Sequence, residues 1–142
     1  MADILHRIQI NAAPPEIYDA LTTIAGVKSW WTDACELSNE EGGRCRFWFD
    51  QKQTCFTMQA TRLLPHQRIF WQCMDGPKEW IGTELWWEIT PTGSQQCQLD
   101  FKHMNWHSDE GAFPLCNTVW GGLMFRLKAY CEHGTRDPMF VN

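Results

Sequence analysis

Two hydrophobic periodicities divide the chain into strands and helices. Apolar and polar residues alternate with period two over several short runs, which is typical of half-buried β-strands. The predicted strands lie at residues 4–10, 44–49, 54–63, 68–74, 83–90 and 96–104. Turn-forming segments such as 75–78 and 91–94 separate the later runs, so this part of the chain is expected to form an antiparallel meander. In residues 54–63 both phases carry apolar side chains, and the inward set stays undecided.

Two helices are expected from a period near 3.6. The first opens at Asn11-Ala-Ala-Pro-Pro-Glu, because proline suits a first helical turn, and is expected to end at Gly26. Its predicted buried stripe is Ile17, Ala20, Leu21 and Ile24. The second covers roughly residues 114–133 and stops at Gly134. Its predicted apolar face comprises Cys116, Trp120, Leu123, Met124, Leu127 and Cys131. This order of elements predicts a single α+β domain over residues 1–142, with the last helix lying across a curved sheet.

Composition excludes several classes of function. The net charge is −5 and no cluster of Lys and Arg is present, which argues against a nucleic-acid partner. The seven cysteines are odd in number and lack C-x-x-C or paired metal spacing, so a reducing cytoplasm is expected. The N-terminus enters a strand-like pattern directly, and no apolar run is long enough to span a membrane. We therefore expect a cytoplasmic protein that is neither exported nor membrane-spanning.

Three segments carry a resemblance to a known family. These are Asn11 to Thr22, the pair Trp30-Trp31, and Trp120 to Gly134. Together they resemble the START-like, or SRPBCC, superfamily, in particular the bacterial branch related to the C-terminal domain of the activator of heat-shock-protein-90 ATPase. The resemblance implies a helix-grip fold, in which a curved antiparallel sheet wraps the C-terminal helix and leaves a deep hydrophobic cavity. Members bind lipids, hormones or polyketides, and some are cyclases or hydrolases. The family has no single catalytic motif, so none is transferred here.

The two adjacent tryptophans of the strand at 83–90 must point to opposite faces of the sheet. Trp87 shares its phase with apolar neighbours and is predicted to face the helix, whereas Trp86 shares its phase with two glutamates and is predicted to face outward. The predicted ligand-binding residues are Phe47, Phe49, Trp71, Trp87, Phe101, His103, Trp120, Gly121 and Met124. Each aromatic is open to two interpretations, ordinary core packing or a pocket wall.

His103 follows the inward phase of the last strand. It could orient a ligand oxygen or act in acid–base chemistry, or it could be a structural histidine with satisfied hydrogen bonds. His107 lies four residues on, but one residue ends a strand and the other begins a loop, which argues against zinc. Four cysteines are expected to point inward: Cys45, Cys73, Cys116 and Cys131. A nucleophilic cysteine paired with His103 is therefore conceivable, although buried thiols are usually structural. No catalytic residue, metal ligand or cofactor is assigned.

Gly121 and Gly122 are unusual in a helix interior, where each costs about 1 kcal/mol relative to alanine. Gly121 is predicted at the margin of the buried face, where a missing side chain would widen the cavity. Gly122 groups with Thr118, Phe125 and Ala129 in a second stripe that is too apolar for a solvated face. We expect another segment or a second subunit to cover it, and a homodimer is one expectation.

Three functions remain from the sequence, in order of preference. The first is binding of a small hydrophobic or aromatic molecule between the sheet and the C-terminal helix. The second is an enzyme of the cyclase, dehydratase or hydrolase kind that uses the same cavity, which would need convergent polar groups. The third is a chaperone-linked interaction module.

Overall fold

Seven antiparallel strands form one sheet in the computed structural model, which describes residues 1–142. The strands are β1 (Ala2–Ile10), β2 (Cys35–Glu36), β3 (Arg44–Phe49), β4 (Thr54–Leu64), β5 (Arg68–Asp75), β6 (Glu84–Gly93) and β7 (Gln96–Trp106). Their order across the sheet is β1-β7-β6-β5-β4-β3-β2, so β3 to β7 form the expected meander and β1 closes one edge beside β7. The predicted strands are all present, and only the two-residue β2 was not expected.

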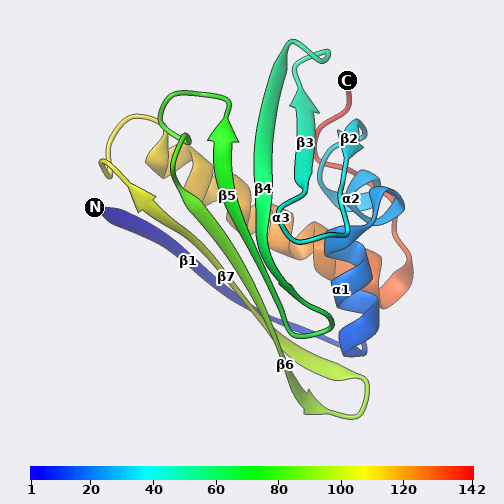
Figure 1. Cartoon of the computed structure of the whole chain (residues 1–142). Helices are drawn as coiled ribbons and strands as arrows, with labels where there is room; N and C mark the ends of the chain where they lie inside the picture. The colour runs from blue at the N-terminus through cyan, green and yellow to red at the C-terminus, as the bar shows by residue number, and fades with distance from the viewer.

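The long helix α3 (Phe113–His133) crosses one face of the curved sheet (Figure 1). Pro114 lies in its first turn, and the helix ends at Gly134, whose φ of 68° a residue with a side chain rarely adopts. Trp120, Leu123 and Leu127 are buried against the sheet. The α+β helix-grip architecture expected from the sequence is therefore confirmed.

The N-terminal helix differs from its prediction because it is two helices, α1 (Pro14–Thr22) and α2 (Ile24–Trp30). Thr23 has extended backbone angles, and its hydroxyl accepts a hydrogen bond from the Gly26 amide at 3.0 Å, which starts α2 in a new direction. Gly26 thus lies inside α2 rather than ending a helix. Ile24, predicted in the buried stripe, is 46% exposed because the chain turns before it.

Strand β4 explains why its inward phase could not be chosen from the sequence. Its pairing with β5 shifts register between Thr57 and Met58 and again between Ala60 and Arg62. A β-bulge places an extra residue in one strand, so the inward and outward phases exchange there. Both phases of the strand are consequently apolar in part.

The two tryptophans of β6 serve different surfaces of the sheet. Trp87 is fully buried beneath α3. Trp86 lies on the outer face, where its ring meets Phe70 edge-on at a centroid distance of 4.6 Å. Beside it Glu88 lies 3.9 Å from both Arg68 and Lys102, so acids and bases cover this face.

None of the helices is both long and apolar enough to cross a lipid bilayer.

Two glycines within helices should respond to alanine in opposite ways. A Cβ at Gly26 would lie 2.6 Å from the Ala20 carbonyl oxygen in α1, whereas a Cβ at Gly121 would lie 3.5 Å from Cε1 of His6, an ordinary contact. We expect Gly26→Ala to reduce the free energy of unfolding by about 1–3 kcal/mol through overpacking. Gly121→Ala should raise it by up to about 1 kcal/mol through helix propensity. Urea denaturation of both variants measures the two values, and equal effects would contradict the close packing of α1 on α2.

Candidate ligand-binding site

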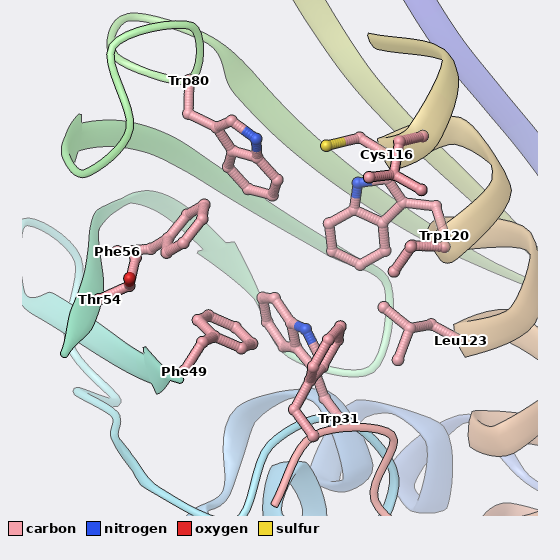
Figure 2. A pocket seen from close by; sticks show the side chains of 11 residues that line it. Trp31, Phe49, Thr54, Phe56, Trp80, Cys116, Trp120 and Leu123 are labelled. Atoms are coloured by element: carbon pink, nitrogen blue, oxygen red, sulfur yellow. The ribbon is translucent and has the colours of Figure 1, made fainter. Parts of the chain in front are cut away.

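A cavity of about 280 Å³ opens between the first half of α3 and the end of the sheet at β3 and β4 (Figure 2). Ten of its eleven lining residues are hydrophobic, and the remaining one is Thr54. The lining comprises Trp31, Phe49, Thr54, Phe56, Trp80, Leu115, Cys116, Val119, Trp120, Leu123 and Phe140. Such a surface binds apolar groups through burial and aromatic contact rather than through charge.

Contacts between aromatic rings hold the wall of this cavity together. Phe56 packs edge-on against Trp80 with a centroid distance of 4.5 Å, and against Phe49 at 5.0 Å. Phe49 in turn meets Phe140 at 5.1 Å. Figure 2 shows Phe49 and Phe56 on one side of the cavity, with Trp120 and Leu123 of α3 facing them. The rings support one another, so the cavity stays open without a ligand to prop it.

The C-terminal segment supplies part of the wall because it is fixed to the end of α2. The Phe140 amide donates to the Trp31 carbonyl at 2.9 Å, and the Asp33 amide donates to the Phe140 carbonyl at 3.1 Å. Beyond it, the backbone and side-chain amides of Asn142 donate to the Asp33 carboxylate at 2.9 and 2.8 Å. These hydrogen bonds hold the pKa of Asp33 below its usual value. The segment therefore presents Phe140 to the cavity in a defined position.

The predicted site residues fall into two groups. Phe49 and Trp120 line the cavity. The others lie outside the lining: Phe47, Trp71, Trp87, Phe101, His103, Gly121 and Met124. The four aromatics of this group are at most 1% exposed and pack on one another and on the lining rings, as in the 4.3 Å contact of Phe101 with Trp120. They form the layer that supports the lining from behind.

Gly121 faces β1 rather than the cavity. Its nearest neighbour is the ring of His6 on β1, at a distance that would admit a Cβ in ordinary contact. The space expected at this position lies instead beside Val119 and Cys116, two and five residues closer to the start of α3.

His103 forms the middle of a buried hydrogen-bond chain that ends at the cavity. Trp120 Nε1 donates to His103 Nδ1 at 3.1 Å, and His103 Nε2 lies 2.8 Å from Thr83 Oγ1. Thr83 Oγ1 donates to the Trp80 carbonyl at 2.6 Å. Since Nδ1 accepts, the ring proton lies on Nε2 and is donated to Thr83. The chain links α3, β7 and the segment before β6, and it fixes two of the lining tryptophans.

The electrostatics of His103 fit this structural role. Burial lowers the pKa of its imidazole from 6.5 to about 3, so the ring is neutral at physiological pH. Both nitrogens are committed within the protein, and the ring does not reach the cavity. Of the two interpretations left open by the sequence, the geometry favours the satisfied structural histidine over the acid–base group.

Cys116 is the cysteine that lines the cavity. Burial raises the pKa of its thiol, and a hydrogen bond from Trp80 only partly opposes that rise. The thiols considered with it as partners of His103 are shifted the same way, with the pKa of Cys73 raised to about 11 and that of Cys131 to about 12. They are protonated near neutral pH, which is the state of structural rather than nucleophilic cysteines.

A family model and a solved structure show which family this chain belongs to. A family model described as "Activator of Hsp90 ATPase homolog 1-like protein" matches residues 11–132. The chain belongs to this family. The solution structure of the Aha1 dimer from Colwellia psychrerythraea is 35% identical, with a TM-score of 0.85 over 94% of this chain and 98% of that one. The resemblance to the START-like superfamily noted in the sequence is thereby confirmed.

More distant structures share the fold alone with this AHSA1-like chain. CalU16 from Micromonospora echinospora is 16% identical, with a TM-score of 0.77 over 96% of this chain and 77% of that one. DynU16, from the dynemicin biosynthetic locus, is 18% identical, with a TM-score of 0.80 over 99% of this chain and 51% of that one. No curated protein sequence matches the chain.

The buried His103 should make stability depend on pH in a defined direction. Its pKa in the folded protein lies below the unfolded value, so its contribution is fully present above pH 6.5 and is lost as the pH falls toward 3. Between pH 6.5 and pH 5 this residue alone should lower the free energy of unfolding by about 1.5–2 kcal/mol. Urea denaturation at the two pH values measures the loss.

The His103→Gln variant should not show this loss of unfolding free energy between pH 6.5 and pH 5. The His107→Gln variant should show it, because His107 is exposed. A wild-type loss that persists unchanged in His103→Gln would contradict a buried neutral imidazole.

Proposed function

We propose that this AHSA1-like chain binds a small, flat, apolar molecule in the cavity between α3 and the end of the sheet. The observation that carries the proposal is a 280 Å³ cavity with ten hydrophobic residues among eleven. An apolar cavity of about 150 Å³ accepts benzene, so one nearly twice as large suits a bicyclic aromatic compound. Ligand pockets of about 300 Å³ and above are common in proteins, and this cavity lies at the small end of that range.

The polarity of the wall supports binding over turnover. Apart from the indole N–H groups of three tryptophans, Thr54 and Cys116 are the lining residues with a polar side-chain atom. The Trp120 N–H is donated to His103, and the Cys116 thiol is protonated and already engaged with Trp80. A cyclase or hydrolase needs at least two polar groups aimed at one reacting centre. The wall offers instead several π-faces and edges, which discriminate between ligands by shape. We infer a carrier or sensor of an aromatic molecule.

Two further features belong to the same proposal. The 35% identical relative from Colwellia psychrerythraea is a dimer, and we propose that this chain also forms a homodimer. The seven cysteines are all free, which supports a reducing compartment such as the cytoplasm.

Filling the cavity from α3 tests the binding proposal. Val119 is a half-buried lining residue, so Val119→Phe places a phenyl ring in the space that the ligand would occupy. With 2-naphthol as the probe, intrinsic tryptophan fluorescence should show saturable quenching in the wild type. We expect Val119→Phe to weaken binding by at least about tenfold, equivalent to about 1.4 kcal/mol of lost contact.

A matched control is available two residues earlier on the same helix. Asn117 is exposed and does not line the cavity, so Asn117→Phe adds the same ring outside it and should bind 2-naphthol like the wild type. Equal affinity in all three proteins would place the probe elsewhere and refute the proposed site.

A further inference from the structure

The outer face of α3 carries an apolar stripe with coiled-coil spacing. Leu115, Thr118, Gly122, Phe125 and Ala129 follow one another at intervals of three, four, three and four residues, and we call them the outer stripe. Leu115 is 67% and Phe125 is 68% exposed. The C-terminal segment covers only the middle, where a Cβ at Gly122 would lie 3.0 Å from Cε of Met139. Most of the stripe is therefore left without a partner from its own chain.

Beside the exposed ring of Phe125 the same face is hollow. A depression of about 310 Å³ lies between α3 and the segment that follows it. Its lining comprises Gly122, Phe125, Arg126, Ala129, Thr135 and Asp137. A projecting aromatic ring next to a hollow on one surface is self-complementary, because a two-fold axis between them places each ring in the hollow of the other copy.

We propose that a second copy of this chain docks antiparallel on the outer stripe, with Phe125 of each copy inserted into the hollow of the other. The inference rests on the homodimer included in the proposed function, and it names the surface and the orientation. The small residues on the stripe let the two helices approach closely around the two rings.

The charges at the two ends of α3 set the antiparallel orientation. Asp109 and Glu110 precede the helix and are exposed. Beyond its end Arg136 is exposed, and the acids at that end, Glu132 and Asp137, are paired with Lys128 and Arg126. An antiparallel pair brings the acidic end of each copy beside the basic end of the other. A parallel pair would bring like charges together, which is unfavourable.

Sedimentation velocity of the full chain over a concentration series tests the surface. The wild type should be a dimer, and Phe125→Glu should weaken association by at least about a hundredfold, because it would bury two unpaired carboxylates in one interface. Thr118→Lys, on the same stripe, should act in the same direction. Leu5→Glu is the matched control, since Leu5 is 63% exposed on β1 and should leave the dimer intact.

A charge reversal tests the orientation. Glu110→Arg should weaken the dimer by about tenfold through two repulsive contacts, and adding Arg136→Glu should restore it. Failure of the double variant to restore association would overturn the antiparallel arrangement.

The possible failures are distinguishable. A monomeric wild type at millimolar concentration would overturn the homodimer and this interface together. A dimeric wild type whose Phe125→Glu and Thr118→Lys variants remain dimeric would overturn the interface alone. Phe125 does not line the cavity, so 2-naphthol should still quench the tryptophan fluorescence of the Phe125→Glu variant. This quenching also shows that the variant is folded. Absence of quenching in a dimeric wild type would refute the binding proposal and leave the interface standing.

Discussion

The hydrogen-bond chain from Trp120 through His103 and Thr83 to the Trp80 carbonyl is the constraint on which the site depends. It is buried, and each donor has one acceptor, so its members have a single arrangement that satisfies them all. One end holds an indole of α3 and the other holds the loop that carries Trp80. These two rings come from different elements and lie 6.1 Å apart between centroids, and the hydrogen bonds fix their positions relative to each other. Loss of any member would leave a buried polar atom without a partner.

The cavity lies at the end of the sheet, where the first half of α3 and the hairpin of β3 and β4 leave a gap between them. Aromatic residues of the central strands alternate inward and meet the buried face of α3 in close contact, as Phe101 does with Trp120 at 4.3 Å. At the end of the sheet the wall combines the first half of α3, the hairpin of β3 and β4, the loop that carries Trp80, and the C-terminal segment. Rings held by such segments are supported from behind but need not interdigitate across the gap. The space between them is the candidate binding site. Leu115 of the outer stripe borders it, whereas Phe125 of the same stripe does not line it.

The hydrophobic period and the turn-forming residues were sufficient to predict the fold, because a period of two or 3.6 residues persists along each long element. The errors lie where a local feature breaks the period: Thr23 restarts a helix before Gly26, and bulges in β4 exchange its faces. The site was less predictable. Alternation separates inward from outward residues, but it does not distinguish an inward ring that packs on other rings from one that faces empty space. Trp80 and Phe140 lie in segments without any period, and the only signal for them was the aromatic residue type.

The nine indole N–H groups offer the most direct test of the central claim, because each gives its own resonance in a ¹⁵N-correlated NMR spectrum. Titration with 2-naphthol should move the signals of Trp31, Trp80 and Trp120, which line the cavity, in a saturable manner with one dissociation constant. The signal of Trp86, on the outer face of the sheet, should stay in place. Saturable shifts confined to Trp86, or no saturable shift at the three lining residues, would contradict the cavity as the binding site.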